Sequence, residues 1–247
     1  MIPPTPRALL GLTLLLSGCG GPRPETLLYE LRIVAAVAEP PEVAQGEPYD
    51  LTAIIADPTG EGGDWMIWGC LPDLGCAVER GELGIDEPTA TVVAVAPAPV
   101  WVMACAPGAC DLSAATDAQL EDPQAWLQDL PVSGVTLGSR LTRITEAPVE
   151  ERNTNPVIDT EPETAVLEGV RREQEVKLPF VVPGAETAFG LATGGGFTMT
   201  EFDVADAGET ELVWVAPEQA GDVTLYVVFD DGLGGSVVWE RVVTVER

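Results

Sequence analysis

The sequence predicts an all-β protein built from two copies of one β-module. Short runs rich in Val and Thr alternate with Pro and Gly, a pattern typical of sandwiches and barrels. The chain also repeats itself, because TVVAVAP at residues 91–97 and ELVWVAP at residues 211–217 lie 120 residues apart. Strong helical patterns are scarce. These observations favour two β-domains in tandem.

Further elements agree between the two copies. EPPEVAQG at residues 39–46 precedes a predicted strand of alternating polarity at 49–55, and EPETAVLEG at residues 161–169 precedes a similar strand at 175–182. The order of elements is the same in both copies, with offsets that agree to within a few residues. Duplication of one module therefore explains the pattern better than chance.

The N-terminus has the features of an export signal. Residues 1–7 contain one cation, Arg7, and residues 8–16 are largely apolar. A bilayer-spanning helix needs about 20 apolar residues, so this segment is too short to span and instead fits a secretory signal. It ends in Leu16-Ser17-Gly18-Cys19, which resembles the lipobox of bacterial lipoprotein precursors.

That resemblance implies lipidation of Cys19, cleavage before it and acylation of the new amine; two or more acyl chains give stable attachment. Residues 1–18 are then the signal peptide and residues 19–29 a tether. No Asp follows the cysteine, which in the family favours the outer membrane of a Gram-negative bacterium. The alternative is an ordinary cleavable signal in which Cys19 is incidental.

The first domain is predicted over residues 30–146, with an inserted segment near 111–132 before a last strand near 133–145. The insertion contains the best helix candidate, Asp122 to Asp129, because Asp stands at the N-cap position and Pro at the first helical position. Residues 147–156, rich in Glu and ending in Asn-Pro, predict a linker.

The second domain is predicted over residues 157–247. Its end forms a hairpin, with strands at 223–229 and 236–245 around an Asp- and Gly-rich turn that supplies positive φ angles. This layout resembles the Ig-like modules of bacterial surface proteins, grouped with PKD and cadherin-like domains. The resemblance covers residues 150–247 better than 30–110, and it implies a β-sandwich fold rather than an activity.

Assigning Cys19 to lipid leaves four cysteines, and an exported protein is expected to oxidise them. We predict disulfides among Cys70, Cys76, Cys105 and Cys110. Local pairs 70–76 and 105–110 are favoured because each intervening loop contains Pro and Gly; a crossed pairing would instead join neighbouring strands. A four-cysteine zinc site is disfavoured by these spacings and by the oxidising location.

No metal site is predicted, although Asp222, Asp230 and Asp231 are weak calcium candidates by analogy with cadherin-like modules. Calcium takes six to eight oxygen ligands, and hairpin chemistry explains Asp-Asp-Gly without it. Most of the six Trp are predicted core residues rather than a carbohydrate-stacking platform. Trp65, beside the Gly-rich 60–63 turn, is the candidate for exposure.

Composition excludes several classes of function. The formal net charge of −28 repels phosphate backbones, so no nucleic-acid partner is expected. The 46% hydrophobic content indicates folded domains. The chain has no His, which removes Ser-His-Asp and Cys-His nucleophile pairs. No cofactor is expected.

We therefore expect a cell-envelope lipoprotein that acts as a non-enzymatic binding, adhesion or structural module. Its partners would be the membrane, through the N-terminal lipid, and an envelope protein or glycan. One alternative is a carboxylate-based envelope enzyme. Another is a subunit of a larger envelope complex, which an exposed apolar patch would indicate.

Overall fold

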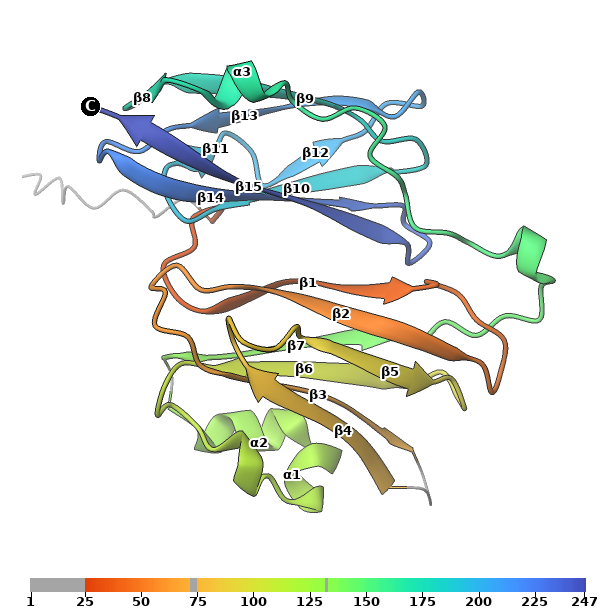
Figure 1. Ribbon diagram of the computed structural model, residues 1–247. Helices are drawn as coiled ribbons and strands as arrows, with labels where there is room; N and C mark the ends of the chain where they lie inside the picture. Colours follow the sequence, from red (N-terminus) through yellow and green to blue (C-terminus); the bar gives the residue numbers. More distant parts are fainter. Residues whose placement is uncertain (1–24, 72–74, 132) are drawn as a thin grey trace, which may run out of the picture.

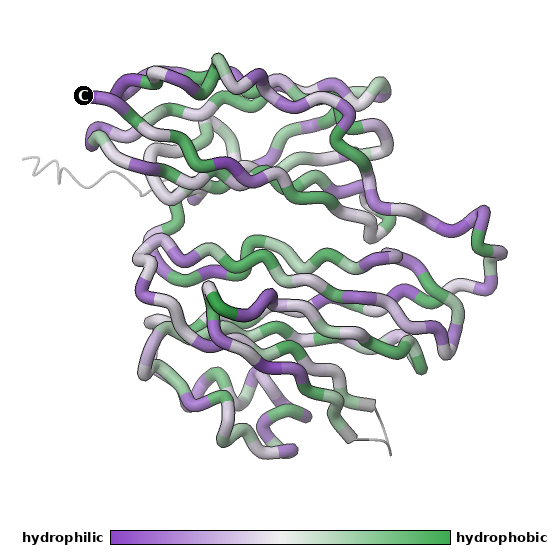
Figure 2. Tube along the Cα trace, viewed as in Figure 1, coloured by the Kyte–Doolittle hydropathy of each residue, from purple (hydrophilic) through white to green (hydrophobic). Residues whose placement is uncertain are grey.

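The computed structural model describes residues 25–71, 75–131 and 133–247, so the predicted signal peptide and Cys19 lie outside it. The chain folds into two β-sandwiches that stack face to face (Figure 1). Hydrophobic and hydrophilic residues alternate along many strands (Figure 2), the pattern of sheets with one buried face. No helix in the described ranges is long and apolar enough to cross a membrane.

The first domain consists of two antiparallel sheets. One has the order β1-β2-β5 and the other β4-β3-β6-β7. The strands are β1 (Arg32–Glu39), β2 (Pro48–Ala56), β3 (Asp64–Leu71), β4 (Gly75–Glu82), β5 (Thr89–Val93), β6 (Pro99–Cys105) and β7 (Val135–Leu141).

The second domain, over residues 157–247, has sheets of order β11-β13-β9 and β12-β10-β14-β15-β8. The strands are β8 (Val170–Arg171), β9 (Glu175–Val181), β10 (Thr187–Ala192), β11 (Gly196–Phe197), β12 (Glu201–Asp203), β13 (Glu209–Val215), β14 (Gly221–Asp230) and β15 (Ser236–Glu246). Two short helices precede them, η2 (Val149–Glu151) and α3 (Thr164–Leu167).

The two domains share one topology, which is that of the immunoglobulin-like fold. The order β4-β3-β6-β7 corresponds to β12-β10-β14-β15, and the pair β2-β5 corresponds to β9-β13. The repeated sequence segments contribute to β5 and β13, which pair antiparallel with β2 and β9 respectively. The predicted all-β fold of two Ig-like sandwiches is therefore confirmed.

The domains differ at the edges of their sheets. β1 joins β2, whereas the short β8 joins β15 as a parallel strand. In the second domain β11 lies along the outer edge of β13, while β5 is the last strand of its sheet. Because no strand in the described part of the chain covers β5, the first domain has an uncovered sheet edge at this place.

The inserted segment forms a helical cover on the first domain. It contains η1 (Leu112–Ala114), α1 (Asp117–Glu121) and α2 (Pro123–Asp129). The outer faces of β3 and β6 carry Met66, Trp68 and Met103, all fully buried beneath these helices. A sheet with apolar residues on both faces needs cover on both faces, and the insertion supplies it.

Local chemistry explains the helix α2 as predicted. The Asp122 side chain accepts a hydrogen bond from the Ala125 N–H at 3.0 Å, and Pro123 occupies the first helical position. Trp126 then packs edge-on against Trp68, whose indole N–H donates to the Leu120 carbonyl at 2.9 Å. The helices are thus both capped and anchored to the sheet.

The predicted tether does not stay separate from the domains. The Leu28 N–H donates to the Ala192 carbonyl at 2.8 Å, and the Ala192 N–H donates to the Thr26 carbonyl at 2.9 Å. The Thr26 hydroxyl also accepts from the Phe197 N–H. Residues 26–28 therefore extend the second domain, because β10 has backbone groups at this end that the segment satisfies.

An apolar cluster seals one end of the contact between the domains. Leu28, Ala56 and Tyr226 are buried there, with Ile54 and Leu191 packed around them. These side chains come from the N-terminal segment, from β2 and from the large sheet of the second domain. The two domains therefore pack through the faces of their sheets. The sequence predicted two domains in tandem but did not predict how they pack against each other.

A polar network fastens the other end. The Arg140 guanidinium donates to the Ala36 carbonyl at 2.7 Å and to the Gly234 carbonyl across the interface. Asn155 donates to the Ala38 carbonyl at 2.8 Å and accepts from the Ser236 N–H at 2.9 Å. Each of these side chains contacts both domains.

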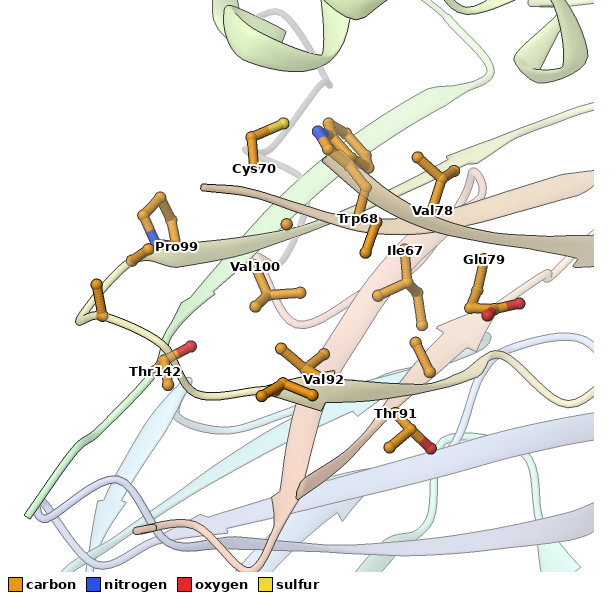
Figure 3. Close-up of a pocket in the computed structure, with 16 residues that line it drawn as sticks. Ile67, Trp68, Cys70, Val78, Glu79, Thr91, Val92, Pro99, Val100 and Thr142 are labelled. Carbon is orange, nitrogen blue, oxygen red and sulfur yellow. The ribbon is translucent and has the colours of Figure 1, made fainter. Parts of the chain in front are cut away.

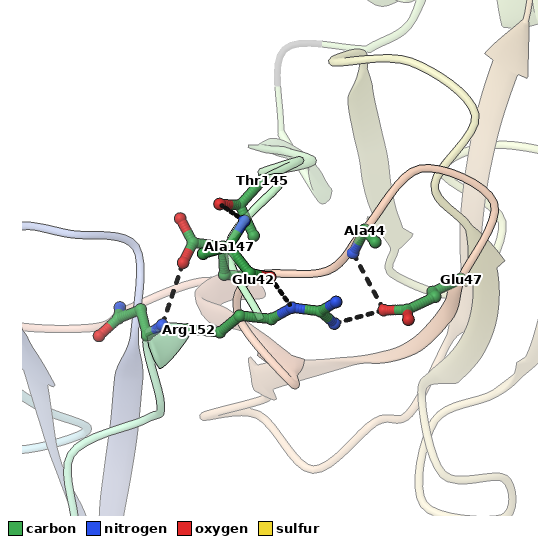
Figure 4. Close-up of polar contacts among 7 residues, drawn as sticks. Glu42, Ala44, Glu47, Thr145, Ala147 and Arg152 are labelled. Atoms are coloured by element: carbon green, nitrogen blue, oxygen red, sulfur yellow. Dashed lines mark hydrogen bonds and ion pairs between the residues drawn. The ribbon is translucent and has the colours of Figure 1, made fainter. Parts of the chain in front are cut away.

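The predicted linker is fixed to the first domain by Arg152 (Figure 4). Its guanidinium forms a 2.5 Å ion pair with Glu47 and donates to the Ala147 carbonyl at 3.0 Å. Glu42 accepts from the backbone N–H of the next residue, Asn153. The linker is therefore held against the first domain by the ion pair and by these hydrogen bonds.

Candidate functional site

The first domain contains an open cavity of about 160 Å³ between its two sheets (Figure 3). One wall comes from β3, β4 and β6, and the other from β5 and the residues after it. In Figure 3 the side chains of Ile67, Val92 and Val100 converge on its centre. The cavity lies at the side of the sandwich where β4 and β5 are the edge strands of their sheets.

The lining is mostly apolar, with a few polar groups. The exposed Glu79 on β4 is the carboxylate of the lining, and Thr142 contributes a hydroxyl. That hydroxyl is already paired with the Tyr49 hydroxyl at 2.7 Å. Burial raises the pKa of Tyr49, opposed by this hydrogen bond and by Arg140. An apolar wall with few polar groups is the usual composition of a small-ligand site.

In the second domain, a short strand and an aromatic ring fill the position that corresponds to the cavity. There β11 pairs with β13, and the Phe197 ring fills the space between the sheets. The ring lies against Gly190, where an added Cβ would overlap it. Gly195, with φ of +72°, allows the chain to approach the Val215 carbonyl closely enough to form β11.

The first domain has a much smaller residue at the position of one large buried side chain. By the 120-residue offset, Ala94 stands in the place of Trp214, whose ring is fully buried in the second domain. Ala90, Ala96 and Ala98 lie along the cavity. Small side chains and the missing covering strand together leave the cavity open.

The outer edge of β5 offers backbone groups beside the cavity. The Ala94 N–H donates to the Glu47 carbonyl and the Pro88 carbonyl accepts from Ala53, both toward β2. In an antiparallel ladder alternate residues face alternate sides, so Thr91 and Val93 direct their N–H groups away from β2. The Val93 side chain is 51% exposed at this edge.

The four predicted disulfide cysteines form two local bridges, Cys70–Cys76 and Cys105–Cys110. Cys70 and Cys76 stand directly opposite each other on β3 and β4. The second bridge joins the end of β6 to the start of the helical insertion. Both bridges lie around the cavity-bearing sheet, and Cys70 contributes to the cavity lining.

The three calcium candidates are not assembled into one site. Asp222 is the second residue of β14 and accepts from the Thr244 hydroxyl, whereas Asp230 ends the same ten-residue strand. Asp231 accepts from the Gly235 N–H at 2.7 Å and from the Asn153 amide at 2.6 Å. In the described ranges no group of three or more His, Cys, Asp or Glu is arranged to hold a metal ion.

Tryptophan forms core rather than an exposed platform. Trp65, which we expected at the surface, is 3% exposed because it faces inward from β3 against Gly81. Trp68, Trp126, Trp214 and Trp239 are buried too. The cavity residues on β5 were not identified from the sequence. The one signal nearby is the small size of Ala94, Ala96 and Ala98, which follow β5.

No known protein-family profile matches this chain, and no curated protein sequence matches it. Solved structures do. The D0–D1 domain of intimin has a TM-score of 0.26 at 10% identity, with 85% of this chain and 98% of that chain covered. The adhesin InvE of Yersinia pseudotuberculosis has a TM-score of 0.27 at 11% identity, covering 86% of this chain and 58% of that one.

A third similar structure is the alpha-2-macroglobulin of E. coli, with a TM-score of 0.26, 8% identity, and 87% of this chain but 17% of that chain covered. All three scores and identities are low. The Ig-like assignment therefore rests on the strand order of the two domains, and the function has to be argued from the site.

Proposed function

We propose that this chain is a lipid-anchored protein of the bacterial cell envelope whose Ig-like domains bind another envelope molecule without catalysing a reaction. The observation that carries the proposal is the open apolar cavity on the flank of the first domain. It is about 160 Å³ in volume and lies beside an exposed sheet edge. A concave apolar site with a few polar groups is the usual starting point for recognition.

The chemistry of the cavity favours binding over catalysis. Carboxylate-based glycoside hydrolysis uses two acidic side chains that flank the reacting bond, and the cavity lining includes one carboxylate, Glu79. The Thr142 hydroxyl is hydrogen-bonded to Tyr49 within the protein. The lining also contains the Thr91 hydroxyl, which donates to the exposed Asp50 carboxylate at 2.7 Å. Among the described lining residues no second carboxylate accompanies Glu79.

The N-terminal segment supports a defined position for the anchor. Thr26 is docked on the second domain and follows Cys19 by seven residues. Seven extended residues span at most about 25 Å. A lipid on Cys19 would therefore hold the second domain close to the membrane, and the interface would hold the first domain on it.

Lipidation itself is tested by metabolic labelling with a fatty-acid analogue. The wild-type protein should carry the label and fractionate with membranes, and a Cys19→Ser variant should do neither. Equal labelling of both proteins would contradict the anchor while leaving the binding site untouched.

Binding is tested by placing a photo-crosslinking amino acid at Val93, beside the cavity, in the full chain in cells. A matched control places it at Met199, which is 58% exposed on the second domain. We expect a discrete crosslinked envelope component from Val93 and none from Met199. Identical patterns from the two positions would contradict a binding role for the first domain.

A further inference from the structure

We propose that the first domain binds an extended peptide segment of a partner protein, which adds to the outer edge of β5 and inserts one aromatic side chain into the cavity. This inference rests on the binding role proposed above and specifies its partner. Addition of a strand to a sheet edge combines main-chain hydrogen bonds with side-chain pockets.

The second domain contains the same arrangement within one chain. β11 pairs antiparallel with β13, with Phe197 opposite Trp214, and the Thr198 N–H donates to the Val213 carbonyl at 2.9 Å. By the 120-residue offset, Val213 corresponds to Val93. The Val93 carbonyl already accepts from the Val95 N–H at 3.0 Å. A guest strand on β5 would therefore pair through the N–H groups of Thr91 and Val93, which are directed away from β2.

The β5 edge lacks the protection found on the other edge strands. Natural sheets blunt their edges with charges, Pro, very short strands or covering groups. β9 carries Lys177 and Pro179, β4 carries Glu79 and Arg80, and β12 has three residues, two of them acidic. The sequence of β5, TATVV, has neither charge nor Pro.

Two long edges remain, β1 and β7. The strand β7 carries Arg140 and lies against β1, and β1 is covered from its outer side. Its backbone groups receive hydrogen bonds from Arg140 and Asn155, and its Ile33 N–H donates to the Thr136 hydroxyl. Among the described strands longer than three residues, β5 is therefore the edge that is most open to a guest.

The cavity has the size and chemistry of an aromatic-ring site. A cavity of about 150 Å³ lined by aliphatic side chains binds benzene, and this one measures about 160 Å³ with Ile67, Val92 and Val100 at its centre. A ring brought in on a strand would repeat the position that Phe197 takes in the second domain. Aromatic side chains are also the commonest anchors of binding interfaces.

Charge determines what flanks the ring. The exposed carboxylates of Asp50, Glu79 and Glu87 lie on strands or turns next to the site, and the whole chain has a formal net charge of −28. Such a surface attracts and steers cationic segments. The partner segment is accordingly extended, with an aromatic residue at its centre and Lys or Arg on each side.

The test uses the mature full-length protein and a synthetic peptide, Lys-Thr-Val-Phe-Val-Thr-Lys, with blocked ends. We expect saturable binding by NMR, with hydrogen-exchange protection of the Thr91 and Val93 amides rising about ten-fold at saturation. Replacing the Phe of the peptide by Ala, or methylating the backbone nitrogens that face β5, should each weaken binding about ten-fold or more.

A protein variant provides the complementary control. Ala98→Phe fills the cavity from its own wall and should weaken the peptide about ten-fold, whereas Leu233→Phe makes the same kind of enlargement on an exposed turn of the second domain and should not. If Ala98→Phe fails to fold, the Phe→Ala and N-methylated peptides still test strand addition on the wild-type protein.

Three outcomes would overturn the proposal. If the N-methylated peptide binds as well as the parent peptide, no strand is added to β5. Protection elsewhere than β5 would place the site elsewhere. If the wild-type protein forms dimers and Ala98→Phe dissociates them, the segment that binds at β5 belongs to a second copy of this chain. Crosslinking from Val93 in cells would still stand in each case, so loss of this inference is distinguishable from loss of the binding role.

Discussion

Glu47 shows how a single side chain connects the linker to the first domain. Its carboxylate accepts from the Ala44 N–H at 3.0 Å and pairs with Arg152. The Ala44 N–H, and then Arg152, lower the pKa of Glu47 below its usual value. Because the charged form is favoured in the folded state, stability is linked to pH through this residue.

We predict that Glu47→Gln lowers the melting temperature at pH 7 and that this difference disappears in acid. A depressed pKa stabilises the folded protein above the unfolded pKa of about 4.3, and that contribution is lost as pH falls through the lower folded value. Thermal melts from pH 7 to pH 3 measure it. Glu61→Gln, in an exposed turn, is the control; an undiminished Glu47→Gln deficit at pH 3 would contradict the linkage.

Tyr226 gives a second test at the domain interface. Burial, and then Glu240 and Asp57, raise the pKa of Tyr226 to about 12. We predict a phenol transition near pH 12 in an ultraviolet absorbance titration of the folded protein, absent in Tyr226→Phe and retained in Tyr29→Phe. The stability linked to this group is present below the unfolded pKa of about 10 and falls as pH rises above it.

At the scale of elements, the helical insertion covers the outer face of the four-stranded sheet β4-β3-β6-β7 in the first domain. The sequence predicts α2 because capping is local chemistry that Asp122 and Pro123 determine by themselves. Its role is not local, since it depends on Met66, Trp68 and Met103 all facing the same side of the sheet. The insertion therefore completes the first domain rather than decorating it.

We predict that Trp126→Ala destabilises the first domain by about 3–5 kcal/mol, the usual cost of deleting a buried aromatic side chain. Trp126 is buried against Trp68, and its loss exposes that cluster. Gln124→Ala, on the exposed side of the same helix, should change the stability by under about 0.5 kcal/mol. Chemical denaturation followed by Trp fluorescence measures both; equal effects would contradict this covering role.

The whole molecule is held together by two passes of the chain. Residues 26–28 pair with the second domain before the chain enters the first, and the linker returns with Asn155 bonded to both domains. Arg140 adds a half-buried cation between them; burial lowers the pKa of its guanidinium, and Tyr49, Asp230 and Asp231 oppose that shift. The two sandwiches are thus expected to unfold in a coupled manner.

We predict that Arg140→Ala uncouples the domains. The variant leaves the half-buried Ala36 and Gly234 carbonyls without this donor and removes a contact between the domains; losing such hydrogen bonds costs stability. Scanning calorimetry should show one transition for the wild type and two for the variant. Arg172→Ala, in an exposed turn, should keep the single transition; two transitions in the wild type would contradict coupling.

We also predict that residues 157–247 made alone fold into a β-rich domain. The second core is built entirely from residues 170–245, including Leu178, Leu212 and Phe229, so it needs no side chain from the first domain. Without residues 26–28, the fragment should unfold at lower denaturant than the second domain of the full chain. A circular dichroism spectrum dominated by helix, or by disorder, would contradict an independent core.

The all-β class, the duplication and the helix α2 are properties of the sequence by itself. They depend on the alternation of side chains, on turn residues and on caps, which act over a few positions. The 120-residue offset between 91–97 and 211–217 identified strands that do pair in the same way in both domains. The local pairing of the cysteines follows from short separations in the chain for the same reason.

The stacking of the two domains, the docking of residues 26–28 and the cavity were decided by the tertiary structure. Each depends on which residues far apart in the chain come together, as with Thr26 and Phe197, 171 positions apart. The cavity in particular results from a strand that the second domain has and the first lacks. A missing neighbour leaves no pattern in the residues of β5, so only the assembled sheets reveal the open edge.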